Sequence, residues 1–266
     1  MDFLERIKAS DSFRRKNMSN GTEPEGPHVL THFGKRLAEL ADIKKGSSVL
    51  DLGMGSGTSL FPATEKVGKT GKVIGIDISK DMVKRTYDKI IDNNLTNAQV
   101  MQTDAKSLIF KDNTFDVVLS GFSYIYSTLE EIKRVLKKGG QFGLSTWKTL
   151  EDMGWMASCL RKYMPIDSKK VYHQDTPHGL RILLSEAGFT NSTVITEEKE
   201  FAYPNEEQWW ADMRESGWDD HLKKIEDMGP GKLEVFKKEA LRKVQIYKKE
   251  QCIPFTVAVR FAFGTK

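Results

Sequence analysis

Residues 48–58 read SVLDLGMGSGT and combine a short apolar run with three closely spaced glycines. The first five residues are typical of a strand that is covered on both faces. Gly53, Gly55 and Gly57 follow at every second position, where the lack of a Cβ lets the backbone adopt positive φ and approach a ligand. A helix that starts near Thr58 directs its unpaired N–H groups into the same space. The stretch therefore predicts a small-molecule site at the carboxyl end of a central strand.

The composition indicates an ordinary globular protein with a mixed surface. The chain has 266 residues, of which 39% are hydrophobic, and its 41 Lys and Arg are interspersed with 37 Asp and Glu. A net charge of +4 favours a Lys-rich soluble surface over nucleic-acid binding. Cys159 and Cys252 lie far apart and form no CxxC pair, which argues against a zinc site or a disulfide framework. No apolar run has the length of a membrane span, and no signal peptide is recognisable, so we expect a cytoplasmic protein.

Apolar strands alternate with helical patterns along most of the chain. The expected strands are residues 48–52, 73–77, 98–101, 115–120, 141–147, 192–196 and 255–263. The alternation predicts an α/β, Rossmann-like sheet of seven mostly parallel strands with an antiparallel C-terminal strand. A helix over about 129–136 is expected to end at Lys138-Gly139-Gly140.

Two segments depart from this alternation. Residues 1–28 are polar and turn-rich, and we expect them to form an N-terminal lid segment. Residues 204–250 have a helical pattern that starts with Asn205 and Gln208 in capping-box positions, which indicates an inserted helical cap. The core then consists of residues 29–203 and 251–266.

The spacing of the glycines distinguishes between two classes of ligand. A dinucleotide fingerprint reads G-x-G-x-x-G, whereas this stretch reads D-x-G-x-G-x-G, with Asp51 two residues before the first glycine. A carboxylate beside the turn suits a cationic ligand and repels a pyrophosphate. The pattern resembles motif I of the class I S-adenosylmethionine-dependent methyltransferases, whose ligand has a sulfonium and an ammonium and no phosphate.

Further motifs of that family follow in order. Asp77 ends the second strand, where the resemblance implies that it binds both ribose hydroxyls, and residues 103–105 (TDA) resemble the segment that reads the adenine amino group. Residues 115–120 resemble motif II, and residues 136–140 resemble the L-K-P-G-G turn with Lys138 in place of the proline. Met54 stands where the family more often has a small residue or cysteine. The cofactor-binding residues implied by the resemblance are Asp51, Gly53, Gly55, Gly57, Asp77, Ile78, Met82, Asp104, Ala105 and Ser120.

The second half of the chain resembles the ubiquinone/menaquinone-biosynthesis-like ("type 11") branch, which methylates small molecules. Residues 184–189 (LSEAGF) resemble its L-x-x-A-G-F turn, and the Trp-rich segment 203–217 resembles its helical cap. Residues 120–123 read SGFS in place of the N-P-P-Y of enzymes that methylate exocyclic amines. Residues 146–149 lack the Asp-Asn pair of the metal-dependent catechol type, so we expect no metal.

The implied reaction is a direct displacement at the sulfonium methyl, with S-adenosylhomocysteine as the product. A hydroxyl acceptor needs a general base, and the candidates are His173, His32 and Tyr124, with surface or packing roles as the alternative. Trp209, Trp210 and Trp218 form either an apolar wall for the acceptor or the core of the cap.

We expect a small, apolar or aromatic acceptor rather than nucleic acid. The basic residues between 237 and 249 are then a solvated helix face. The alternatives are an RNA methyltransferase on the same fold and a non-catalytic protein that binds S-adenosylmethionine.

Overall fold

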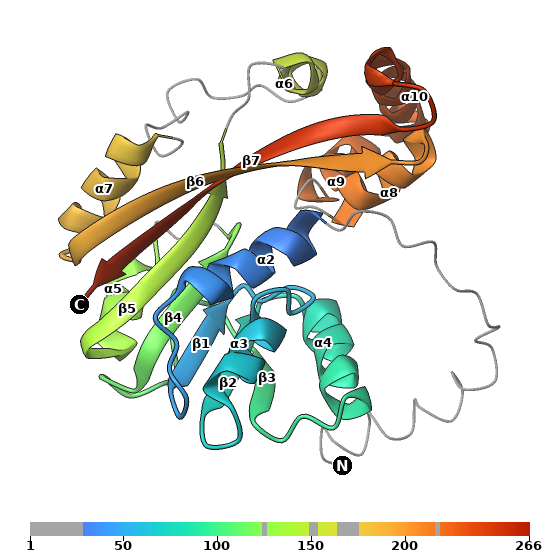
Figure 1. Cartoon of the computed structure of the whole chain (residues 1–266). Coiled ribbons are helices and arrows are strands. Elements are labelled where there is room, and N and C mark those ends of the chain that lie inside the picture. Colours follow the sequence, from blue (N-terminus) through green and yellow to red (C-terminus); the bar gives the residue numbers. More distant parts are fainter. Residues whose placement is uncertain (1–28, 124–126, 149–153, 164–175, 216–218) are drawn as a thin grey trace.

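The computed structural model describes residues 29–123, 127–148, 154–163, 176–215 and 219–266. These residues form one seven-stranded sheet with the strand order β3-β2-β1-β4-β5-β7-β6 (Figure 1). The strands are β1 (Ser48–Leu52), β2 (Lys72–Asp77), β3 (Ala98–Gln102), β4 (Phe115–Gly121), β5 (Leu136–Trp147), β6 (Thr190–Tyr203) and β7 (Ile253–Thr265). The helices are α2 (Val29–Leu40), α3 (Leu60–Val67), α4 (Lys80–Asp92), α5 (Leu129–Val135), α6 (Gly154–Arg161), α7 (Pro177–Glu186), α8 (Glu206–Glu215), α9 (Asp219–Asp227) and α10 (Lys232–Val244), followed by the 3₁₀ turn η4 (Gln245–Tyr247).

The pairing of the strands confirms the predicted fold class. Strands β3, β2, β1, β4 and β5 run parallel to one another. The C-terminal strand β7 runs antiparallel to both β5 and β6. Strands β1 and β4 are neighbours, so the strand order reverses between them, and the carboxyl ends of strands at such a reversal are where open α/β sheets bind ligands.

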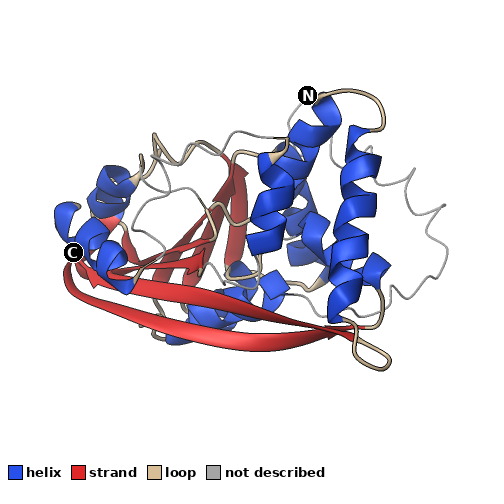
Figure 2. Ribbon diagram, turned by 90° about the horizontal axis from the view of Figure 1, so that it is seen from above, coloured by secondary structure: helices blue, strands red, loops and turns tan. Residues whose placement is uncertain are grey.

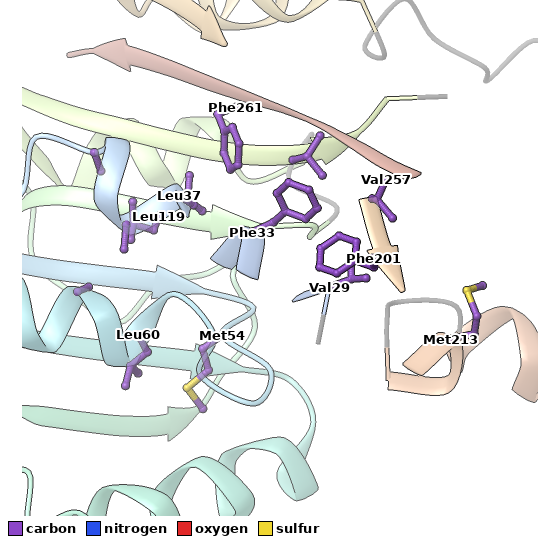
Figure 3. Packing of buried hydrophobic residues seen from close by; sticks show 14 of the residues in the cluster. Val29, Phe33, Leu37, Met54, Leu60, Leu119, Phe201, Met213, Val257 and Phe261 are labelled. Atoms are coloured by element: carbon purple, nitrogen blue, oxygen red, sulfur yellow. The ribbon is translucent and has the colours of Figure 1, made fainter. Parts of the chain in front are cut away.

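Helices cover both faces of the sheet. Helices α2, α3 and α4 contribute to one hydrophobic cluster, and α5 and α7 contribute to a second cluster on the other face. Figure 3 shows the first cluster, in which Phe33 of α2 lies between Phe201 of β6 and Phe261 of β7. The ring centroids of Phe33 and Phe201 are 6.0 Å apart, and those of Phe33 and Phe261 are 6.3 Å apart. Helix α2 is therefore fixed across the sheet by its aromatic residues.

The expected end of the helix before β5 is wrong, and a proline is accommodated at the start of α3. The helix expected to run to Lys138-Gly139-Gly140 ends at Val135, because β5 already begins at Leu136, which pairs with Phe115. The register then shifts before Val117 pairs with Gln141, so the two glycines lie in an irregular part of β5. Pro62 is the third residue of α3, in the first turn, where a missing N–H costs no helical hydrogen bond.

Strands β6 and β7 form a long hairpin that carries helices at its far end. Figure 2 shows these helices grouped at one end of the two long strands, with the C-terminus at the other end. Asn205 begins α8, since its Oδ1 accepts a hydrogen bond of 2.9 Å from Gln208 N. Tyr203 Oη donates a hydrogen bond of 2.5 Å to Asp212 Oδ2 and so joins the end of β6 to α8. We call α8, α9 and α10 the cap helices.

Candidate functional site

The glycine turn, residues 53–58, lies at the carboxyl end of β1 between β2 and β4. All three glycines have positive φ, which is 63° for Gly53, 52° for Gly55 and 85° for Gly57. A Cβ at Gly53 would lie 2.2 Å from Ser123 Oγ, and a Cβ at Gly57 would lie 2.5 Å from the Phe61 ring. A Cβ at Gly55 would meet no atom of the described residues within 4 Å. Gly55 thus adopts a backbone conformation that residues with a Cβ rarely take, and it lies beside open space, which suits a backbone that contacts a ligand.

Two side chains hold the backbone of Gly55. Asp77, at the end of β2, accepts a hydrogen bond of 2.9 Å from Gly55 N through Oδ2 and one of 2.8 Å from Ser79 N through Oδ1. Thr86 of α4 donates a hydrogen bond of 2.8 Å to Gly55 O. The sequence did not single out Thr86. Its position one helical turn after Met82, on the buried face of α4, was the available indication.

Asp51 is a buried carboxylate below the turn. Its exposed fraction is 0%, and its Oδ2 accepts a hydrogen bond of 2.8 Å from Ser59 Oγ. Its Oδ1 is buried without a hydrogen-bond partner among the described residues. Burial first, and then the nearby charge of Asp77, raise the pKa of Asp51 to about 7. An unpaired buried carboxylate oxygen at this position fits a cationic group of a ligand.

The other predicted cofactor residues on β2, β3 and α4 lie at the same edge of the sheet. Thr103 N donates a hydrogen bond of 3.1 Å to Asp77 O, which brings the segment 103–105 beside Asp77. Asp104 is exposed and accepts a hydrogen bond from Lys106 N, while Ala105 is half-buried. Ile78 is 70% exposed, an unusual state for a large apolar residue at a strand end. Met82 is half-buried in the first turn of α4.

Serine side chains connect β4 to the turn. Ser120 is 1% exposed, and its Oγ donates a hydrogen bond of 3.4 Å to Leu52 O. Ser123 Oγ lies 3.4 Å from Gly53 O, so the loop after β4 packs directly on the first glycine. Ser59 and Ser123 were not singled out from the sequence, because small hydroxyl residues are common in such loops.

Met54, the residue that departs from the family pattern, points away from the open space. It is 3% exposed, and Figure 3 shows its side chain near Leu60. A Cβ added to Gly75 of β2 would lie 2.3 Å from Met54 Sδ, so Met54 fills the space above that glycine. The larger residue therefore changes the packing below the turn and leaves the ligand side free.

A stacked aromatic pair lies at the carboxyl ends of β4 and β5. The rings of Phe122 and Trp147 are 4.1 Å apart between centroids, at an interplanar angle of 29°. Phe122 has a φ of +54°, which is rare for a bulky residue and marks a constrained position. The sequence did not predict this pair. From the sequence, the segment around Trp147 indicates only that an Asp-Asn pair for a metal is lacking.

Of the three candidate bases, the structure describes His32 alone. His32 lies on α2, where its ring packs against Phe33 and Phe201, and its Nδ1 lies 3.1 Å from Lys199 Nζ of β6. Burial, and then the charge of Lys199, lower the pKa of His32. No contact among the described residues joins His32 to the glycine turn. Tyr124 and His173 lie outside the described residues.

The tryptophans of the cap are packed in its interior. Trp209 and Trp210 are buried in the first hydrophobic cluster, while Trp218 lies outside the described residues. Trp209 contacts Trp155 of α6, with ring centroids 6.1 Å apart. The Nε1 atoms of Trp155 and Trp209 are buried without a hydrogen-bond partner among the described residues.

The described ranges contain neither a candidate metal cluster nor a helix that could span a membrane. They contain no group of three or more His, Cys, Asp or Glu side chains that could hold a metal ion. In the same ranges, no helix has the length and apolar character needed to cross a membrane.

Comparisons with known proteins find relatives that are named methyltransferases. The chain is 33% identical over 126 residues to the aklanonic acid methyltransferase DauC of Streptomyces sp. (strain C5), covering 46% of this chain and 57% of that protein. It is 40% identical over 122 residues to the ubiquinone/menaquinone biosynthesis C-methyltransferase UbiE of Hydrogenovibrio crunogenus, covering 44% of this chain and 47% of that protein. The chain thus spans about half the length of the curated relatives it matches.

The fold and the family are shown by two further comparisons. The crystal structure of the YcgJ protein of Bacillus subtilis is similar with a TM-score of 0.57 and 19% identity, covering 88% of this chain and 98% of that one. A family model described as a methyltransferase domain matches residues 43–207, more than half of the chain. The chain therefore belongs to the methyltransferase domain family, as the resemblance of residues 48–140 indicated.

Proposed function

We propose that this protein transfers a methyl group from S-adenosylmethionine to a small-molecule acceptor with an apolar or aromatic body. The observation that carries the proposal is the combination of open space at Gly55 with the unpaired buried oxygen of Asp51. The names of the relatives, which act on aklanonic acid and in quinone biosynthesis, support an aromatic or quinone-like acceptor.

The residues around the turn fit this methyl donor. S-adenosylmethionine has an ammonium group and a sulfonium and no phosphate, so the carboxylates of Asp51 and Asp77 attract it, whereas they repel a dinucleotide. Asp77 would hold the ribose, Ile78 and Met82 would cover the adenine, and Asp104 would bind its amino group. The 70% exposure of Ile78 supports this assignment, because an adenine ring would cover it.

The donor supplies an activated methyl group when it is bound, so the protein has three tasks. It must orient the donor, align the acceptor with the methyl group and exclude water. The hydrogen bonds of Asp77 and Thr86 to Gly55 give the turn a fixed shape before binding, which serves the first task. Phe122 and Trp147 supply a flat apolar surface beside the turn, which serves to align the acceptor and to exclude water.

A general base is needed only when the acceptor is a hydroxyl. His32 is the described candidate, and its lowered pKa keeps it neutral near pH 7. The ammonium of Lys199 can only donate, so Nδ1 of His32 accepts from it and is occupied. Proton acceptance at Nδ1 therefore requires Lys199 to move away, and a base at Tyr124 or His173 remains a parallel hypothesis.

Calorimetry with S-adenosylhomocysteine tests the donor site. Asp77→Asn keeps the shape of the side chain and removes its charge, so the hydrogen bonds to Gly55 and Ser79 lose their charge-assisted strength. Affinity is expected to fall at least tenfold. Asp92→Asn, an exposed change at the end of α4, is the matched control and should leave affinity unchanged. Equal affinity in all three proteins contradicts the site assignment.

Incubation with methyl-labelled donor and cell extract tests the acceptor class. The label is expected in the small-molecule fraction that partitions into organic solvent. Label in the RNA fraction identifies an RNA methyltransferase instead, and no transfer with intact donor binding indicates a non-catalytic binding protein. Transfer in the presence of a metal chelator is expected to be unchanged, since we predict no metal.

A further inference from the structure

The positive charge of the protein is concentrated in α10 and the turn that follows it. Residues 232–249 contain seven Lys or Arg and two Glu, an excess of five, whereas the whole chain has an excess of four. The rest of the chain is therefore slightly acidic. Figure 1 shows α10 at the outer end of the β6–β7 hairpin, far from the β3 edge of the sheet.

Helix α10 has two faces with different roles. Its inward face consists of Phe236, Ala240 and Val244, which are all buried. The outward face is formed by residues spaced three and four apart, which point to one side of a helix. We call Val235, Lys238, Arg242 and Ile246 the outward stripe.

The outward stripe combines exposed cations with exposed apolar residues. Val235 is 60% exposed and Ile246 is 76% exposed, so two aliphatic side chains face solvent at the ends of the stripe. Lys238 and Arg242 are exposed between them along the helix. The stripe thus places an aliphatic residue at each end and two cations in the middle, along α10 and η4.

The cations of the stripe are less engaged than the other basic residues of the segment, although the charge of Arg242 helps the hydrogen bond from Lys162 to lower the pKa of Glu239. Other basic residues of the segment are engaged within the cap, since Lys237 pairs with Glu207 at 2.7 Å and Lys248 with Glu206 at 3.7 Å. Lys238 and Arg242 form no hydrogen bond or ion pair with any residue in the described ranges. The segment thus separates into cations that hold the cap together and cations that face outward.

We propose that the outward stripe docks the protein on the surface of an anionic lipid bilayer. Basic side chains are attracted to anionic headgroups, and exposed aliphatic side chains gain by entering the boundary with the acyl chains. A nucleic acid uses the cations alone, because its phosphate backbone offers no apolar region to Val235 and Ile246. The apolar ends of the stripe therefore favour a bilayer over RNA. Docking of this kind needs no membrane-spanning helix.

Vesicle flotation tests the proposal with the full chain. Vesicles of 30% phosphatidylglycerol in phosphatidylcholine are expected to bind the protein, whereas pure phosphatidylcholine vesicles bind it much more weakly. Each neutralised cation near an anionic surface costs about 1 kcal/mol, so Lys238→Ala with Arg242→Ala should weaken partitioning about 30-fold. Ile246→Ser is expected to weaken it about 10-fold. Binding should also fall as the salt concentration rises.

The matched control removes the same charge elsewhere. Lys69 and Lys72 are exposed lysines at the start of β2, on the amino-terminal edge of the sheet. Lys69→Ala with Lys72→Ala should change partitioning by less than twofold. An equal loss in both double variants overturns the proposal, because net charge and not the stripe would then explain binding.

Other occupants of the stripe give distinct results. Failure to bind the anionic vesicles overturns the proposal. An RNA gel shift or a self-association that the stripe variants abolish would then identify the occupant. Affinity for S-adenosylhomocysteine should be the same in every variant. This measurement shows that each variant is folded and separates the docking surface from the proposed methyl transfer.

Discussion

The glycine turn and the cap helices differ in what gives them their shape. The turn is shaped by its backbone, through positive φ at Gly55 and hydrogen bonds from Asp77 and Thr86 to backbone atoms. The cap is shaped by side-chain packing, with Trp209 fully buried against Trp155 and Phe255. A backbone-built site requires particular residue types at fixed positions, whereas a packed core accepts many apolar combinations of similar volume. The glycine turn is therefore recognisable in the sequence, whereas the packing of the cap is not.

The largest effect should come from the cap and should leave the turn intact. Trp209→Ala removes a fully buried indole and is expected to lower the free energy of unfolding by about 3–5 kcal/mol. Affinity for S-adenosylhomocysteine should stay within about twofold. Urea unfolding and calorimetry measure the two quantities, and Val235→Ala on the exposed side of the cap is the control, with an effect below about 0.5 kcal/mol. A matching loss of affinity would falsify the separation of the two regions.

Gly55→Val should produce the opposite result. The positive φ costs about 1–2 kcal/mol of stability, while the new side chain fills the space beside the turn and lowers affinity for S-adenosylhomocysteine at least 100-fold. Gly68→Val is a close control, because Gly68 also has a positive φ of 65° and open space around its Cβ position among the described residues. It should cost at least as much stability, because its ψ of −171° lies in a region that only glycine favours, and it should leave affinity unchanged. If both variants bind alike, Gly55 does not face the ligand.

Asp51 should make the ligand-free protein sensitive to pH. Burial raises its pKa to about 7 in the folded state, above the ordinary value of about 4 in the unfolded state, so the folded state holds the proton more tightly. Stability from this group is full below about pH 4 and falls as the pH rises to about 7. Between pH 5 and pH 8 the parent should lose roughly 2–3 kcal/mol relative to Asp51→Asn.

The same ionisation should affect the ligand in the opposite sense. Ionised Asp51 attracts the ammonium of S-adenosylhomocysteine, so the parent should bind it more tightly at pH 8 than at pH 6. Asp51→Asn should bind weakly at both pH values. A flat pH profile of affinity in the parent would mean that Asp51 remains protonated or remote from the bound ligand.

The smallest effect concerns the junction between the sheet and the cap helices, where β6 meets α8. Burial raises the pKa of Tyr203, so its Oη stays protonated and donates to Asp212 at 2.5 Å. Tyr203→Phe removes this bond and should lower the free energy of unfolding by about 1–2 kcal/mol, with donor affinity unchanged. Tyr87→Phe on α4 is the control. An effect of Tyr203→Phe no larger than that of the control means that packing alone holds α8 to β6.

The sequence predicted the order of the strands along the chain and the place of the glycine turn, but β6 runs over Thr190–Tyr203 and not only over residues 192–196. Alternating strands and helices predicted the parallel core, and Asp51 and Asp77 predicted a cationic nucleoside ligand before any contact was known. The end of the helix at Val135 was missed, because the strand propensity of Leu136 is visible only once it pairs with Phe115. The assignment of individual residues to the donor remains a prediction that the variants above test.

The contacts on the proposed acceptor side could not be predicted from the sequence, for a physical reason. Phe122 and Trp147 stack because β4 and β5 are neighbours, and no spacing between residues 122 and 147 encodes that contact. His32 illustrates the same limit, since Lys199, which occupies its Nδ1, is 167 residues away in the chain. Side chains from distant segments meet only after the fold exists.

The pairing of β6 with β7 has a consequence for how such proteins diversify. The last pair of the hairpin joins Tyr203 to Ile253, so the 49 residues between them leave and re-enter the sheet at adjacent points. An insert with this geometry can be lengthened, shortened or exchanged without changing any strand register. β1 and its glycine turn lie three strands away from β7 in the sheet. The strands that carry the glycine turn therefore keep their pairing whatever the length of this insert.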